Sequence, residues 1–177
     1  MKRIQLRFDS IQQIVGGEGI SVIVLTDMER KNALSVVCDG HMSHQLLMRV
    51  NNIKECDNML PETLVGLLKD KFELMIYGLY DGQYQVVLMD EFGNSKRMRI
   101  SDAILLTMIS DTPLYIEGTL LERQSVPYDA DAKGIAIPIN TMDVPRLKQA
   151  LQRAVDDENY ELASQLRDEI NRRREKY

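Results

Sequence analysis

Short apolar runs in the first two thirds of the chain predict a set of β-strands. In residues 2–9 the apolar side chains of Ile4, Leu6 and Phe8 occupy every second position, so they share one face of a half-buried strand. Other runs of similar length are bounded by turn residues, which is typical of strands. These further strands are expected at residues 20–26, 34–38, 74–80, 84–89, 95–100 and 113–117.

Two glycine-containing segments between the strands predict turns. Asp81-Gly82 separates two predicted strands and favours a two-residue hairpin turn, because glycine tolerates positive φ. The stretch Gly16-Gly17-Glu18-Gly19 lacks the helix-opening context that a phosphate-binding loop requires. We therefore interpret this second segment as an ordinary turn.

Apolar residues at helical spacing predict several helices among these strands. The helices are expected at residues 41–50, from Pro61 onward, at residues 103–109 and from Leu120 onward. Ser101 stands shortly before the third helix, where a serine side chain can accept a hydrogen bond from a free backbone N–H. We expect Ser101 to be the N-cap of that helix.

The end of the chain predicts a pair of helices. Apolar residues recur at the spacing i, i+3, i+4, i+7 and i+8, which indicates an amphipathic helix; they are Leu147, Ala150, Leu151, Ala154 and Val155. Residues 156–159 interrupt this pattern. A second helix follows on the same logic, with its apolar positions at Tyr160, Ala163, Leu166 and Ile170.

Together these elements predict an α+β fold, with a mixed or antiparallel β-sheet, packed helices and a C-terminal α-helical hairpin. We expect an α+β domain at residues 1–125, a linker at 126–142 that is rich in Pro, Gly and Asp, and the hairpin at 143–177. Two short helices cannot bury enough surface to be comfortably stable alone. Their apolar stripe needs a second surface, which is the main domain, a copy of the chain or another protein.

Charge and composition limit the function classes and the compartment. The net charge of −5 belongs to residues 1–142, because residues 143–177 carry eight basic and eight acidic residues. A nucleic-acid site would therefore need a local basic patch on an acidic body. No apolar run is long enough for a membrane span, and the charged N-terminus does not resemble a signal peptide. We expect a cytoplasmic protein in which Cys38 and Cys56 are free thiols.

The second half of the hairpin resembles a known interaction motif. Residues 159–170 read Asn-Tyr-Glu-Leu-Ala-Ser-Gln-Leu-Arg-Asp-Glu-Ile, and this stretch is similar to the UVR motif of the excision-repair proteins UvrB and UvrC. In that family the motif is a helical hairpin for protein–protein contact. The resemblance implies a protein partner, and the candidate partner-binding residues are Tyr160, Ala163, Leu166, Arg167 and Asp168. Tyr160 is expected to pack against the first helix of the pair, with Arg167 and Asp168 near the rim.

The main domain resembles the bacterial bifunctional nuclease domain from residue 20 to about residue 122. The closest local similarity is Arg99-Ile100-Ser101-Asp102-Ala103, followed by Pro113-Leu114-Tyr115-Ile116. Family members commonly end in a UVR hairpin, so the two resemblances support each other. The chain departs from the family pattern at Ile100, where the family has proline, and at the start of the second helix, where the family's histidine is missing.

The nuclease resemblance implies a DNA or RNA phosphodiester as substrate and a site at Arg99, Ser101 and Asp102. Arg99 would pair with a phosphate, and Asp102 would hold a water or a divalent metal such as Mg²⁺, although the sequence fixes no metal ligand. The same residues also permit a purely local interpretation. Ser101 would then cap a helix, Asp102 would complement the helix dipole, and Arg99 would pair with a carboxylate.

A different set of residues raises the alternative of a structural zinc site. His41 and His44 are three positions apart on a predicted helix, and Cys38 and Cys56 lie nearby in the sequence. Two cysteines and two histidines are a zinc-binding combination, but this spacing matches no common zinc module. The alternative is a pair of buried thiols with solvated histidines.

Two functions from different classes follow from these patterns. The first is a nuclease that its UVR hairpin recruits to a protein partner. The second is a catalytically inactive adaptor or scaffold in DNA repair or a stress response, which the departures from the nuclease pattern and the acidic main domain favour. Exposed strand edges in a small sheet also predict self-association into a homo-oligomer.

Overall fold

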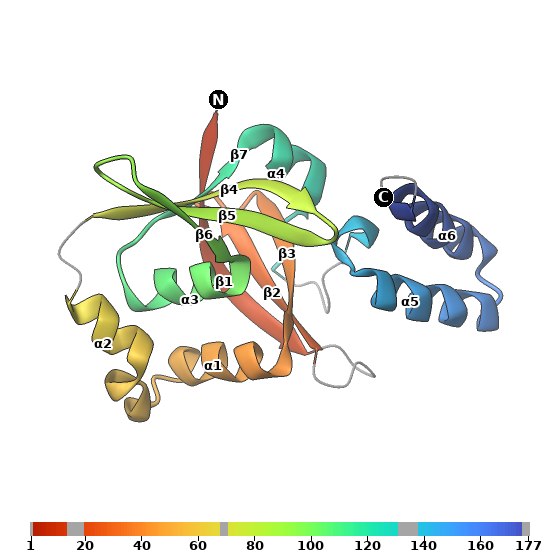
Figure 1. The fold of residues 1–177 in the computed structure, drawn as a ribbon. Helices are drawn as coiled ribbons and strands as arrows, with labels where there is room; N and C mark the ends of the chain where they lie inside the picture. The colour runs from red at the N-terminus through yellow and green to blue at the C-terminus, as the bar shows by residue number, and fades with distance from the viewer. Residues whose placement is uncertain (1, 14–19, 68–70, 131–137, 175–177) are drawn as a thin grey trace.

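The computed structural model describes residues 2–13, 20–67, 71–130 and 138–174. The strands in these ranges are β1 (Arg3–Gln13), β2 (Ile20–Asp27), β3 (Asn32–Asp39), β4 (Phe72–Tyr80), β5 (Gln83–Asp90), β6 (Ser95–Arg99), β7 (Leu114–Glu117) and β8 (Ser125–Pro127). They form one sheet in the order β6-β5-β4-β7-β1-β2-β3-β8. Neighbouring strands are antiparallel, except that β4 and β7 are parallel. The predicted α+β fold with a mixed sheet is confirmed (Figure 1).

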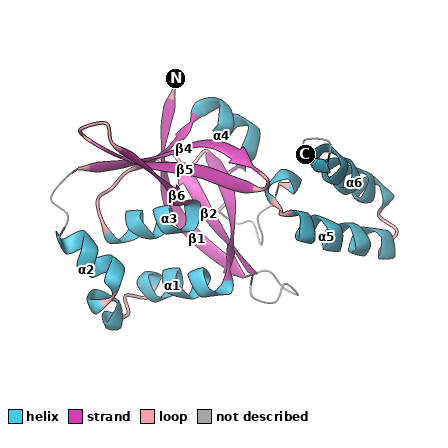
Figure 2. Cartoon of the chain, viewed as in Figure 1, coloured by secondary structure: helices cyan, strands magenta, loops and turns pink. Residues whose placement is uncertain are grey.

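The described helices comprise a group beside the sheet and a pair at the end of the chain. They are α1 (Gly40–Val50), α2 (Leu60–Leu67), α3 (Ile100–Ile109), α4 (Gly118–Gln124), α5 (Val144–Asp156) and α6 (Tyr160–Arg174), with short 3₁₀ helices η1 (Lys54–Asn58) and η2 (Ile139–Thr141). Figure 2 shows α5 and α6 as a hairpin to one side of the sheet. Among the described residues, no helix has the length and apolar character that crossing a membrane requires.

The alternating pattern at the N-terminus places β1 in the interior of the sheet. Leu6 of β1 is paired with Leu114 of β7 on one side and with Asp27 of β2 on the other. Its side chain is buried in the main core, and Ile4 and Phe8 pack against that core. The predicted one-sided burial is confirmed, and the strand extends beyond the predicted residue 9, with a bulge between Phe8 and Ser10.

The turn between β4 and β5 has the predicted hairpin geometry. Asp81 and Gly82 have φ values of 47° and 75°, so both lie in the left-handed region that a type I′ turn requires. Tyr80 and Gln83 on either side are paired in the ladder. The turn therefore projects Asp81 and Gly82 from the end of the sheet that faces the C-terminal hairpin (Figure 1).

Two hydrophobic clusters stabilise the described part of the molecule. In the larger one, Ala103, Ile104 and Leu105 of α3 are buried against the sheet, and α3 contacts strands as far apart in the sheet as β3 and β5. The smaller cluster belongs to α5 and α6, and Ile139 and Met142 pack against it from residues 138–143, the connector that leads into α5. The C-terminal hairpin thus has a small core of its own.

The predicted linker is partly ordered against the sheet. Val126 of β8 pairs with Ala33 of β3, and the next residue but one, Tyr128, donates its hydroxyl to Asp9 of β1. Residues 131–137 lie outside the described residues, as does the predicted turn at Gly16–Gly19. The division into domains at residues 125 and 142 stays a prediction.

Candidate functional site

Arg99, Ser101 and Asp102 lie where β6 runs directly into α3. Arg99 is the last residue of the strand, and Ser101 and Asp102 are in the first turn of the helix. The Arg99 guanidinium donates two hydrogen bonds to Asp102, from Nε to Oδ2 at 2.6 Å and from Nη2 to Oδ1 at 3.0 Å. This hydrogen bonding raises the pKa of Arg99. The structure therefore brings the predicted residues together, with Arg99 and Asp102 already paired.

Ser101 is not the N-cap of α3, so that prediction is wrong. The helix begins at Ile100, its N-cap is Arg99, and no side chain makes the capping hydrogen bond. The physical reason is that β6 continues into α3 without a loop, which moves the helix start ahead of the serine. Ser101 instead lines a surface cleft.

This cleft, of about 530 Å³, has walls from the sheet domain and from the start of the C-terminal hairpin. Strands β3, β5 and β6 and the start of α3 contribute residues to it, and so do the connector and the first turn of α5. The charged residues that line the cleft are Asp39, Arg97, Arg99, Asp143 and Arg146. Asp102 is not among the lining residues, although its partner Arg99 is.

The two carboxylates of the cleft are occupied by helix capping. Asp39 accepts a hydrogen bond from the backbone N–H of Met42 at 2.8 Å, and Asp143 accepts one from that of Arg146 at 2.9 Å. These bonds fix the starts of α1 and α5. Three arginines share the cleft with these two aspartates, so its lining has a formal excess of one positive charge on an acidic chain.

Nucleophilic chemistry by the cleft's cysteine is disfavoured at neutral pH. Cys38 lines the cleft but is buried. Burial, together with the nearby charge of Asp39, raises the pKa of the Cys38 thiol to about 11. The thiol therefore stays protonated, whereas a nucleophilic cysteine needs a lowered pKa.

The candidate zinc ligands are not assembled. Cys38 and Cys56 are buried, while His41 and His44 are exposed on α1. Within the described ranges no group of three or more His, Cys, Asp or Glu side chains is arranged to hold a metal ion. The alternative with buried thiols and solvated histidines describes these four residues.

The C-terminal hairpin buries most of its predicted apolar stripe. Ala163, Leu166 and Ile170 of α6 are buried against α5. Tyr160 is not, because its side chain is 67% exposed, and the prediction that it packs against α5 is wrong. Tyr160 is the first residue of α6, directly after the turn, and its side chain points to solvent.

Arg167 and Asp168 lie on the solvent side of α6, as predicted. Their side chains are more than half exposed and form an ion pair at 3.1 Å. Arg167 also donates a hydrogen bond to the Ser164 hydroxyl at 3.2 Å. Together with the exposed ring of Tyr160, they present charged and aromatic groups to solvent, and such groups are available to a partner.

Comparison with known protein families identifies this hairpin. A family model described as the UvrB/uvrC motif matches residues 144–176, which span α5, the turn and α6. The hairpin is a UVR motif. No curated protein matches the chain, and the similarity of the main domain to bifunctional nucleases stays a prediction.

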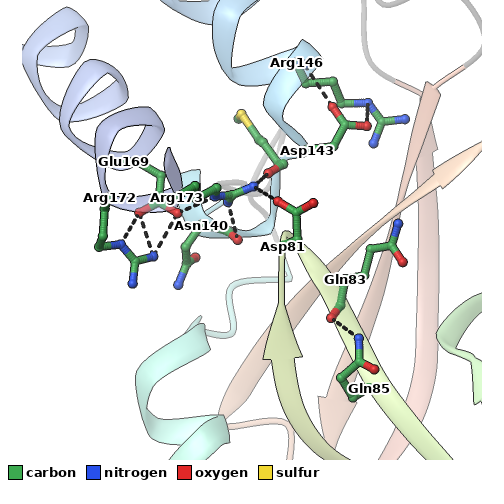
Figure 3. Close-up of polar contacts among 10 residues, drawn as sticks. Asp81, Gln83, Gln85, Asn140, Asp143, Arg146, Glu169, Arg172 and Arg173 are labelled. Atoms are coloured by element: carbon green, nitrogen blue, oxygen red, sulfur yellow. Dashed lines mark hydrogen bonds and ion pairs between the residues drawn. The ribbon is translucent and has the colours of Figure 1, made fainter. Parts of the chain in front are cut away.

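The UVR hairpin is docked on the sheet through one buried arginine (Figure 3). Arg173 of α6 is 8% exposed. Its Nη1 donates to Asp81 Oδ1 at 3.1 Å and to the carbonyl of Met142 at 2.7 Å, and its Nη2 donates to the carbonyl of Asn140 at 3.0 Å. Its Nε donates to Glu169 Oε1 at 2.8 Å. One side chain thus joins α6, the connector and the β4–β5 turn.

Two carboxylates balance the buried positive charge of Arg173. Burial alone would raise the pKa of Glu169, but the hydrogen bonds from Arg173 and Arg172 outweigh it and lower that pKa. Glu169 is therefore ionised at neutral pH, as a partner of a buried guanidinium must be. Asp81 supplies the second carboxylate from the sheet side.

The role of Arg173 in docking the UVR hairpin on the sheet was not predicted from the sequence. A run of cations at a helix C-terminus is an ordinary complement to the helix dipole. The spacing of Arg173 in the sequence could have indicated this role. Arg173 lies three residues after Ile170 and seven after Leu166, so it continues the buried stripe of α6. An arginine at a buried position of such a stripe indicates that hydrogen-bond acceptors surround its guanidinium group.

Proposed function

We propose that this protein acts in DNA repair as a nuclease, with the UVR hairpin binding a protein partner and the sheet domain hydrolysing a DNA or RNA phosphodiester. The observation that carries the proposal is the cleft with three arginines beside Ser101, next to the UVR hairpin. Guanidinium groups pair with phosphate oxygens and stabilise the charge that develops there during hydrolysis. The net negative charge of the chain makes such a local group of cations informative.

The roles of the three candidate residues follow from their contacts. Arg99 would exchange its hydrogen bonds to Asp102 for a phosphate oxygen. This exchange frees the Asp102 carboxylate to accept a proton from a water molecule. Ser101 lines the cleft at the start of α3, where backbone N–H groups favour an anion.

Of the three candidate residues, Asp102 is the one whose side chain offers a carboxylate to a divalent metal. Asp102 supplies carboxylate oxygens, and Mg²⁺ is commonly held by one or two carboxylates together with substrate phosphates. No cluster of three or more candidate ligands supports it in the part of the chain that is described. When bound, Mg²⁺ would neutralise phosphate charge, while Arg99 and Asp102 orient the phosphate and the water.

Replacing Asp102 with alanine is expected to lower the rate of oligonucleotide hydrolysis by about 100-fold or more, because the proton acceptor is removed. The measurement uses labelled single-stranded DNA, double-stranded DNA and RNA, each with and without Mg²⁺ or Mn²⁺. Asp111→Ala is the matched control, because it removes an exposed carboxylate just beyond the other end of α3. Equal hydrolysis by wild type and Asp102→Ala would eliminate Asp102 from the site.

The second candidate function is an adaptor without catalysis. The observation that favours it is the closed pair of Arg99 and Asp102, in which two hydrogen bonds occupy both groups. In this case the UVR hairpin carries the function through its exposed surface. Self-association and a cytoplasmic location stay predictions for both candidates.

Partner binding by the UVR hairpin is expected to depend on Tyr160 and Arg167. The double variant Tyr160→Ala/Arg167→Ala should recover at least about tenfold less of its partner. The reason is that tyrosine and arginine side chains often contribute most of the binding free energy of an interface. Affinity capture with quantitative mass spectrometry measures this, with Glu122→Ala on α4 as an exposed control. Both side chains are exposed, so the melting temperature should hardly change. Equal recovery by the double variant and the control would count against these contacts.

A further inference from the structure

The UVR hairpin forms one wall of the cleft that contains Arg99 and Ser101. Arg146 lies in the first turn of α5, and Asp143 is the N-cap of that helix. Both line the cleft together with Gln83 and Gln85 of β5, and Figure 3 shows these four residues in one region. The cleft is therefore incomplete without the UVR hairpin.

Arg146 is available to an anion in this position. Its Nε lies 3.7 Å from Asp143 Oδ2, a long ion pair, and its side chain is 31% exposed. Its place is fixed by the capping bond from its own N–H to Asp143 and by the bonds of Arg173 to the connector just before α5. A cation held in this way needs little rearrangement to bind a ligand.

We propose that Arg146 of the UVR hairpin and Arg97 and Arg99 of β6 together bind a phosphate of a nucleic-acid backbone. The site is thus shared between the sheet domain and the UVR hairpin. This inference rests on the proposed function for its ligand class, and it gives the UVR hairpin a direct role in holding the substrate. The carboxylates of Asp39 and Asp143 in the same cleft cap α1 and α5 through one oxygen each, and the three arginines outnumber these two anions.

The test measures the affinity of the full chain for a labelled single-stranded oligonucleotide, by fluorescence anisotropy at several salt concentrations and without divalent metal. Arg146→Gln should weaken binding about tenfold and reduce the slope of log K against log salt by about 0.7. The matched control is Arg153→Gln, which removes an exposed arginine of α5 that does not line the cleft.

The outcomes separate this inference from the proposed nuclease activity. Equal affinities and slopes for Arg146→Gln and Arg153→Gln would overturn the shared site, even if wild type hydrolyses nucleic acid. Binding with the expected loss in Arg146→Gln but without any hydrolysis would support the shared site and refute the nuclease. Failure of the wild-type chain to bind any oligonucleotide would overturn both.

Discussion

Replacing Arg173 with alanine is expected to lower the free energy of unfolding of the UVR hairpin by about 3 kcal/mol. The variant leaves the Glu169 carboxylate without its buried cation and the carbonyls of Asn140 and Met142 without a donor. It also removes the ion pair to Asp81 that joins α6 to the β4–β5 turn. Uncompensated buried acceptors cost more than the hydrogen bond itself contributes.

Hydrogen exchange resolved by residue checks this expectation. Protection should fall for the amides of α6 and remain for those of β4, because the two elements belong to separate hydrophobic clusters. Arg172→Ala is the matched control, since Arg172 also pairs with Glu169 but its side chain is 57% exposed. Arg172→Ala should change the free energy of unfolding of the UVR hairpin by less than about 1 kcal/mol. Equal loss of protection in the two variants would show that the buried contacts of Arg173 do not hold the hairpin.

Gly82→Ala is the second change with a large expected effect. A Cβ on Gly82 would lie 2.6 Å from the carbonyl oxygen of Met142 and 3.2 Å from the backbone nitrogen of Asp143. Neither backbone atom can move aside as a flexible side chain would, so the start of α5 must shift away from the turn. This displacement should cost about 2 kcal/mol, in addition to about 1 kcal/mol for alanine at positive φ.

A second glycine of the chain separates these two contributions. Gly93 has a φ of 84° and open space where its Cβ would be, so Gly93→Ala should show only the backbone cost. Urea unfolding of the two variants gives the difference in free energy directly. If Gly82→Ala is no more destabilised than Gly93→Ala, the close approach between the turn and the connector does not contribute to stability.

Local patterns were sufficient to predict most of the fold. The alternation at Ile4, Leu6 and Phe8 predicted a strand with one buried face, and Asp81-Gly82 predicted the hairpin turn, because both depend on short-range geometry. The spacing of Ala163 and Leu166 predicted the buried side of α6 for the same reason.

The errors concern contacts between elements distant in sequence or the exact start of a helix. Ser101 matched the preference for an N-cap, but the direct passage from β6 into α3 moved the cap to Arg99. Tyr160 lay at a position of the apolar stripe, but as the first residue of its helix it is exposed to solvent. The roles of Arg173 and Arg146 depend on how the hairpin meets the sheet, which periodicity within one helix does not encode.

The docked arrangement connects the two halves of the proposed function. Arg173 holds the connector against the β4–β5 turn, and the connector leads into the helix start that carries Arg146. A partner that binds the exposed side of α6 near Arg167 would leave the cleft open, because Arg167 does not line it. The protein partner and the nucleic acid would then occupy one chain at the same time.

The most direct test of the account is a titration of the full chain with a short single-stranded oligonucleotide, followed by backbone amide NMR. We expect chemical shifts to change together at residues 97–101 and at Asp143 and Arg146, which line the cleft from the sheet domain and from the start of the UVR hairpin. Changes confined to other surfaces, such as α2, or no changes at saturating oligonucleotide, would contradict it.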